Sequence, residues 1–295
     1  MKKVIGIFMT LMMVTMIFAG CNPNEASSNN DPGTTSTPEI VENLSGNVKT
    51  GGSTSVEKVM GALIYQFEED NKNVTVDYEG NGSGDGIVNT ISGLYEIGHS
   101  SRELKTDGTE DGLDATAYAI DGIAIVVHKD NEVDNLTKEQ IFGIYTGKIT
   151  NWSEVGGKDA LITVITRESG SGTRSAIADI IGLEKKDDDS TNIVSGANEA
   201  NNTGAVQTQV SSNADAIGYM SFSDVDTSKV NTVKYEDVAI SEEALKDGTY
   251  KLMRAFLLLT KTGEELSAQA QAFMDFVMSD AGQQIVIDNK LLSIK

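Results

Sequence analysis

The stretch LITVITRESGSGTRSAIADII, residues 161–181, contains the pattern that decides the fold. Residues 161–166 are rich in β-branched and apolar side chains, which predicts a strand. Apolar residues at the spacing of one helix face follow between Ala176 and Ile181. The loop between them, residues 167–173, consists of Arg, Glu, Gly, Ser and Thr. A strand that passes through a short loop into a helix is the repeating unit of an α/β fold.

Strand-like and helix-like segments alternate in the same way through the rest of the chain from Leu44 onward. We expect helices at residues 56–67, 87–91 and 266–278, and strands at residues 74–78, 122–128, 216–222 and 252–260. This alternation predicts an α/β fold with mainly parallel strand pairing.

Two further junctions of this kind contain Gly, Ser and Thr. They are GGSTS at residues 51–55 and GNGSGDG at residues 80–86. A helix N-terminus presents unpaired N–H groups and a partial positive charge, and Ser and Thr add hydroxyl donors. Each junction alone also fits an ordinary N-cap and turn. Three converging junctions would surround a small tetrahedral oxyanion.

None of these loops matches a nucleotide-binding motif. The chain contains no G-x-x-x-x-G-K-[ST], and Asp85 takes the last Gly place of a G-x-G-x-x-G pattern. A Ser nucleophile at Ser171 would need a base, and only His99 and His128 are available, without a G-x-S-x-G elbow. We therefore expect no catalytic residues and no enzyme activity.

The composition restricts the partners further. Lys plus Arg number 23 against 44 Asp plus Glu, which gives a formal net charge of -21. This charge opposes binding to nucleic acid and to anionic lipid. One Cys and two His exclude an intrachain disulfide and a Cys/His zinc site. We expect no metal, no cofactor and no nucleic-acid partner.

The N-terminal region has the pattern of an export signal. Two Lys precede an apolar run at residues 4–19, which is short for a spanning helix of about 20 residues. The run ends in FAGC, which resembles a bacterial lipoprotein signal and implies that residues 1–20 are removed and that Cys21 is lipidated. Phe18 departs from the usual Leu, Val or Ile, and an ordinary cleaved signal or a retained anchor helix are the alternatives.

Residues 22–43 are rich in Asn, Ser, Thr, Glu and Pro, which predicts a flexible tether. Together with Cys21 they form the predicted anchor and tether, residues 21–43. The folded part is expected to begin near Leu44.

Several stretches together resemble the phosphate-binding lipoproteins that feed Pst-type ABC phosphate importers. They are GSTSVEKVM at 52–60, GNGSGDGI at 80–87, IGHSSREL at 97–104, DGIAIVV at 121–127, LTKEQIFGIYTGKITNWSEVGG at 136–157, RESGSGTR at 167–174 and AIGYMSF at 216–222. The resemblance covers nearly the whole folded part, and RESGSGTR and TGKITNW are its most specific segments.

The resemblance implies a two-domain α/β fold of the periplasmic-binding-protein-like type II class, with hinge strands and a ligand cleft. We expect domain one to contain residues 44–123 and 251–295, and domain two to contain residues 124–250.

By position, the resemblance places phosphate contacts in each of the three loops. These contacts fall on Thr54, Ser55, Ser83, Arg167, Ser171, Gly172 and Thr173, with Ser101 on the same lip as Ser83 and with Ser53 and Arg102 as weaker candidates. Hydroxyl and backbone N–H groups donate to phosphate oxygens, and Arg167 adds one charge-assisted, bidentate contact.

Ser101 departs from the better-known Gram-negative members, which carry an Asp acceptor at that place. Such an acceptor takes the proton of hydrogen phosphate and repels sulfate. We hypothesise that Asp121, at the start of the strand at 122–128, supplies this acceptor; a turn or strand-start role is the alternative. Arg102 is expected to touch phosphate, to orient the site through a carboxylate such as Glu168, or to lie on the surface. Trp152 is expected at a domain surface.

These features together predict an extracellular, lipid-anchored, monomeric solute-binding protein. It would capture inorganic phosphate between two domains and deliver it to the membrane subunits of an ABC importer. The alternatives are a binding protein for another tetrahedral oxyanion, such as sulfate or molybdate, and an adhesin-like surface lipoprotein.

Overall fold

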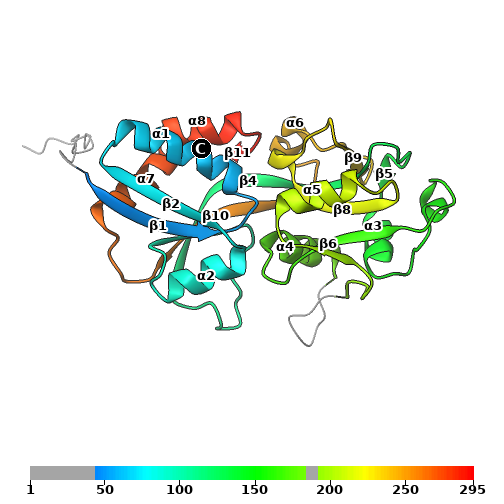
Figure 1. Ribbon diagram of the computed structural model, residues 1–295, viewed down its shortest axis with the longest axis horizontal. Helices are drawn as coiled ribbons and strands as arrows, with labels where there is room; N and C mark the ends of the chain where they lie inside the picture. The colour runs from blue at the N-terminus through cyan, green and yellow to red at the C-terminus, as the bar shows by residue number, and fades with distance from the viewer. Residues whose placement is uncertain (1–43, 184–191) are drawn as a thin grey trace, which may run out of the picture. The chain divides into compact units, whose positions relative to one another are not determined.

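The computed structural model describes residues 44–183 and 192–295 (Figure 1). The predicted signal at residues 1–20, the lipidation site Cys21 and the tether at 22–43 lie outside the described residues. Among the described residues, every helix is too short or too polar to span a membrane.

The first part of the chain forms a parallel three-stranded unit. Its elements are β1 (Gly46–Gly52), α1 (Glu57–Asp70), β2 (Val74–Gly80), α2 (Ser83–Ile91) and β3 (Ile97–Ser100). β1 pairs parallel with both β2 and β3. The predicted helices at 56–67 and 87–91 and the strand at 74–78 are confirmed.

The C-terminal part of the chain returns to this unit. It contributes β10 (Met253–Lys261), α7 (Ala268–Met278), α8 (Asp280–Asp288) and β11 (Leu292–Ser293). Helices α1, α7 and α8 contact one another and lie along one side of β1 and β2, whereas α2 lies on the other side (Figure 1). The apolar faces of α1 and α7 therefore bury a shared core, which includes Val59, Leu63 and Phe273.

The middle of the chain forms a second group of elements. These are β5 (Asn135–Leu136), α3 (Lys138–Tyr145), the 3-10 helix η1 (Trp152–Val155), β6 (Thr163–Arg167), α4 (Gly172–Ile181), β7 (Asn198–Ala200), α5 (Thr203–Ser211), β8 (Ala216–Ser221), the 3-10 helix η2 (Phe222–Asp224), β9 (Val230–Tyr235) and α6 (Glu242–Lys246). Here β6 lies between β8 and β7 and pairs parallel with both. A separate core cluster, with Ile125, Ile177 and Tyr219 among its members, fills this group.

Two long strands connect the two cores. β4 (Leu113–His128) carries Tyr118 in the first core and Ile125 in the second. β10 pairs with it in the antiparallel sense and carries Phe256 in the first core (Figure 1). The predicted domain limits at residues 123 and 250 lie close to where these strands pass from one core to the other, and they stay a prediction.

The expectation of mainly parallel pairing is wrong, because the centre of the sheet is antiparallel. The strand order is β2-β1-β3-β10-β4-β8-β6-β7, and β10 pairs antiparallel with β3 and β4, as β4 does with β8 and β9. A chain that leaves the first core along one strand and returns along an adjacent one must run antiparallel there. β4 also begins nine residues before the predicted strand at 122–128, since residues such as Asp114 and Thr116 are too polar to suggest a strand.

The prediction that Trp152 lies at a surface is also wrong. Its side chain is fully buried in the second core, and its indole N–H donates to the Asp215 carbonyl at 3.0 Å. A single Trp at the start of a short 3-10 helix gives no periodic signal from which its burial could be predicted.

Candidate functional site

The first junction lies between β1 and α1. Gly52 adopts φ +135°, and a Cβ atom there would lie 2.2 Å from the carbonyl oxygen of His99, so the turn requires Gly. The Ser53 N–H donates to the same carbonyl at 3.0 Å. This turn brings Thr54 and Ser55, both buried, to the edge of the sheet in front of α1.

The second junction lies between β2 and α2 and meets the end of β3. Ser83 is the first residue of α2 and is fully buried. The Ser101 N–H donates to Ser83 Oγ at 3.1 Å, and the two Oγ atoms are 3.3 Å apart. Ser53 Oγ donates to Ser101 Oγ at 2.8 Å. The structure therefore joins the first two junctions through the Ser101 hydroxyl.

The third junction, between β6 and α4, contributes the charged group. The Arg167 side chain is 1% exposed, and its Nε and Nη2 atoms each donate to one carboxylate oxygen of Glu168 at 2.7 Å. Nη2 also donates to Thr54 Oγ1 at 3.0 Å. The guanidinium of the second group of elements thus reaches a hydroxyl of the first.

Two more contacts bring the third junction against the others. Thr173 Oγ1 lies 2.9 Å from Ser55 Oγ, and both side chains are buried. A Cβ atom at Gly172 would lie 2.2 Å from Ser83 Oγ and 2.5 Å from Ser101 Oγ. The backbone of α4 can approach these two hydroxyls so closely only because residue 172 is Gly.

These residues form a buried cluster of hydroxyl groups, two of which accept from one guanidinium. We define the hydroxyl cluster as Ser53, Thr54, Ser55, Ser83, Ser101, Arg167, Gly172, Thr173 and Thr203. A hydroxyl rotates freely and can donate to an anion as well as to a neighbour. Neutral donors around one guanidinium are suited to bind a small oxyanion.

Thr203 is the member of this cluster that no sequence pattern predicted. Its Oγ1 accepts from Arg167 Nη1 at 3.2 Å and lies 3.2 Å from the hydroxyls of Thr54 and Ser55. It is the first residue of α5, directly after β7 and Asn202. β7 has only three residues, so the sequence shows no strand pattern before this fourth junction. The run NNTG at 201–204 nevertheless contains Asn, Thr and Gly, residue types that also occur in the other loops.

Three of the predicted phosphate ligands have hydrogen-bond partners outside the hydroxyl cluster. Ser171 is the N-cap of α4 and its Oγ accepts from the Arg174 N–H at 3.3 Å. Arg102 donates from Nη1 to Glu110 at 2.8 Å, so the carboxylate that it pairs with is Glu110 and not Glu168. Asp121 accepts from Arg254 Nη2 at 3.0 Å and from Ser221 Oγ at 2.8 Å.

Burial controls the charge of the buried titratable groups near the cluster. It raises the pKa of Asp121 to about 6, although Arg254 and Ser221 oppose the shift. It lowers the pKa of His99 to about 3, so the imidazole is neutral at pH 7. His99 Nε2 lies 2.7 Å from Thr50 Oγ1, and in the described part of the chain neither His99 nor His128 contacts Ser171.

Residues 35–281 match the family model described as a PBP superfamily domain. The phosphate-binding protein PstS of Borreliella burgdorferi is 30% identical over 84% of this chain and 90% of its own length. The chain belongs to the PstS family of the PBP superfamily. The predicted family and the two-domain, periplasmic-binding-protein-like fold class are thereby confirmed.

Solved structures of family members agree with this membership. A Clostridium perfringens protein assigned as a phosphate ABC transporter substrate-binding protein, with bound phosphate, has a TM-score of 0.80 and 40% identity. The match covers 85% of this chain and all of that one. An ABC-type phosphate transport receptor from Vibrio cholerae has a TM-score of 0.71 and 33% identity, over 84% of this chain and all of that one.

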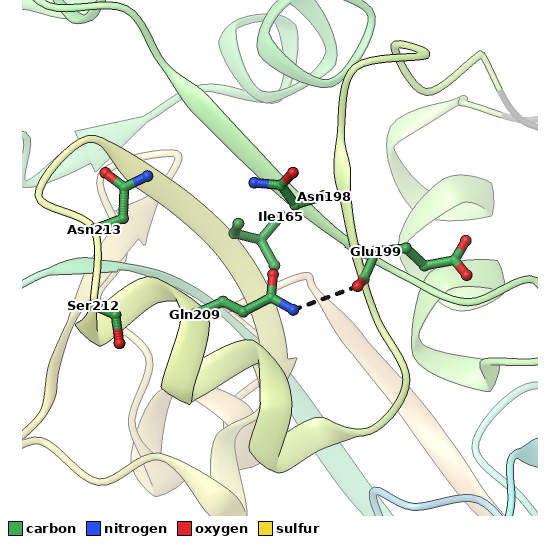
Figure 2. Close-up of a pocket in the computed structure, with 6 residues that line it drawn as sticks. All are labelled: Ile165, Asn198, Glu199, Gln209, Ser212 and Asn213. Carbon is green, nitrogen blue, oxygen red and sulfur yellow. Dashed lines mark hydrogen bonds between the residues drawn. The ribbon is translucent and has the colours of Figure 1, made fainter.

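A pocket at the far end of the sheet lacks the features of an anion site. Figure 2 shows its lining, which consists of Ile165, Asn198, Glu199, Gln209, Ser212 and Asn213. The Gln209 amide donates to the backbone oxygen of Glu199 at 3.4 Å, and the Glu199 carboxylate is directed away from the other labelled side chains (Figure 2). No cation lines this pocket in the part of the chain that the structure describes, so the hydroxyl cluster is the candidate site of this PstS family member.

Proposed function

We propose that this chain captures inorganic phosphate and delivers it to the membrane subunits of an ABC importer. The observation that carries the proposal is a pair of contacts between the two core regions: Arg167 Nη2 donates to Thr54 Oγ1, and Thr173 Oγ1 lies 2.9 Å from Ser55 Oγ. Its relatives are phosphate-binding proteins, and the Clostridium perfringens structure contains phosphate.

The proposed ligands act as neutral donors with one cation. Thr54, Ser55, Ser83, Ser101 and Thr173 donate from their hydroxyls, and Gly172 donates from its backbone N–H at the start of α4. Two further residues complete this set. Ser171 holds the start of α4 in place as its N-cap, and Arg167 provides the charged contact through Nη1 and Nη2, the atoms that donate to Thr203 and Thr54.

The proposed mechanism is closure of the two domains on phosphate. The two long strands β4 and β10 connect the two cores, so bending there separates or joins the two sets of donors. Phosphate stabilises the closed form because only in that form do the donors of both domains reach it. The proposed division places residues 44–123 and 251–295 in domain one and residues 124–250 in domain two.

The proposed setting is the outer face of the cell membrane. Cys21 would carry the lipid anchor and residues 22–43 would be the tether, which lets a monomer reach the importer. The protein would bind phosphate without converting it. This agrees with His99, whose lowered pKa of about 3 makes it a weak base and whose Nε2 lies 2.7 Å from Thr50 Oγ1.

A calorimetric titration tests the function and its selectivity. The full chain is unfolded and refolded to remove bound anions, and is then titrated with phosphate, sulfate and molybdate. We expect heat of binding with phosphate and none with sulfate or molybdate. Binding of sulfate or molybdate in preference to phosphate would favour a different oxyanion carrier, and no binding at all would contradict the proposed function.

A further inference from the structure

The side chain of Thr203 contacts three members of the hydroxyl cluster, Thr54, Ser55 and Arg167. It is 3% exposed, whereas its neighbours Asn202 and Gly204 are exposed. The Asn202 side chain accepts from the Ala205 N–H at 2.8 Å, which caps α5 and fixes the first helical residue in position. The fold therefore directs this one side chain inward at the start of an otherwise solvent-facing turn.

The partners of the Thr203 hydroxyl are all proposed phosphate ligands. Its Oγ1 lies 3.2 Å from Thr54 Oγ1, from Ser55 Oγ and from Arg167 Nη1. A hydroxyl donates one hydrogen and accepts up to two. Arg167 donates to Thr203 and cannot accept from it. The one hydrogen of the Thr203 hydroxyl is therefore available to a single acceptor, such as the Thr54 or Ser55 hydroxyl.

We propose that Thr203 is an additional direct ligand of phosphate, an inference that rests on the function proposed above. An anion that accepts from Thr54, Ser55 and Arg167 lies within reach of the Thr203 hydroxyl, since all three groups surround that one atom. α5 thereby contributes a fourth strand-to-helix junction to the site. The second group of elements then provides hydroxyl donors from two helices, α4 and α5, rather than from one.

Thr203→Val is the variant that tests this role, because Val has the same shape and no hydroxyl. The matched control is Thr208→Val on the same helix, where the hydroxyl is exposed and donates to the Gly204 carbonyl at 3.0 Å. Calorimetric titration of the full chain with inorganic phosphate should show a loss of about 10-fold to 100-fold in affinity for Thr203→Val, as expected for a hydrogen bond to a charged group. Thr203→Ser should keep most of the affinity, and Thr208→Val should match the wild type.

Combining Thr203→Val with Arg167→Ala shows whether Thr203 binds phosphate directly or only positions Arg167. In an Arg167→Ala protein, a direct ligand still matters, so adding Thr203→Val should lower the phosphate affinity again by about 10-fold. If the double variant binds as tightly as Arg167→Ala alone, Thr203 acts through Arg167 and the inference is wrong. Equal affinities of Thr203→Val and Thr208→Val would also overturn it.

Separate control experiments test the folding of the variants and the proposed phosphate binding of the wild type. Thr203→Ala replaces Thr203→Val if the latter does not reach the wild-type melting temperature without phosphate. A wild-type chain that does not bind phosphate refutes the proposed function itself. A wild-type chain that binds, together with a Thr203 variant that binds equally well, refutes only the role of Thr203.

Discussion

Asp121 and Arg254 face each other across the two strands that connect the cores. Their Cα atoms are register partners in the β4–β10 pair, and Arg254 Nη2 lies 3.0 Å from Asp121 Oδ2. Their side chains are 0% and 3% exposed. Ser221 of β8 donates to the same carboxylate, so Asp121 joins three strands where the chain passes between the cores.

We expect Asp121→Asn to lower the free energy of unfolding by about 3–5 kcal/mol, because the substitution leaves the buried Arg254 charge unpaired. Urea denaturation of the variant and of the wild type measures this. The control is Asp114→Asn, which changes an exposed carboxylate at the other end of β4. A stability equal to that of the control would contradict a structural role for the pair.

The same variant tests whether Asp121 accepts the proton of hydrogen phosphate. If it does, the ratio of phosphate affinity to sulfate affinity should be lower in the folded variant than in the wild type, because the carboxylate that repels sulfate is removed. Titrations with both anions at a temperature where the variant is folded give this ratio. A ratio unchanged from the wild type would leave Asp121 with only its structural partners, Arg254 and Ser221.

The neighbouring Asp224 should make stability depend on pH. Burial, together with the nearby Asp121 charge and against the effect of Lys58, raises its pKa from 3.8 to about 7. Between pH 4 and 7 the folded protein therefore holds a proton that the unfolded chain has lost. The free energy of unfolding should fall as the pH rises through this window, by at most about 1.4 kcal/mol per pH unit for one group.

Asp224→Asn should make this fall shallower without abolishing it, because it removes one of two buried carboxylates with a raised pKa and leaves Asp121. Urea denaturation at pH 5 and at pH 8 gives the difference for the variant, the wild type and an Asp70→Asn control, which changes an exposed carboxylate at the end of α1. An unchanged pH dependence in Asp224→Asn would show that burial does not hold a proton on Asp224.

The positions of the three loops along the chain could be predicted from the sequence, but the contacts between the loops could not. The loops at 51–55, 80–86 and 167–173 lie where strand patterns change to helix patterns, so their place in the fold followed from periodicity. Their mutual contacts depend on pairs far apart in the chain, such as Ser55 with Thr173. For those contacts the prediction rested on family resemblance.

The errors have physical causes in particular residues. Thr203 was not predicted because the preceding strand, β7, is too short to show an alternation of apolar and polar residues. The antiparallel centre was missed because the first half of β4 alternates small and polar residues, and because the return of β10 depends on topology rather than on local pattern.

Arg167→Ala should weaken phosphate binding by at least about 1.5–3 kcal/mol, because it removes the charged donor of the cluster. Lys246→Ala, at the exposed end of α6, removes one positive charge and serves as the control for a general electrostatic effect. Titration of each variant with phosphate measures the difference. An Arg167→Ala protein that binds phosphate normally would refute the proposed site.

Gly172→Ala tests whether the close approach of α4 is needed for binding. The added Cβ would lie 2.2 Å from Ser83 Oγ and 2.5 Å from Ser101 Oγ, so the two sets of donors could not meet as they do. Overpacking of this kind costs typically about 1–3 kcal/mol, which should appear as weaker phosphate binding. The matched control is Gly170→Ala in the same loop, where a Cβ has no neighbour within 4 Å. If both variants bind phosphate equally well, the contact between Gly172 and the Ser83 and Ser101 hydroxyls is not part of the bound state.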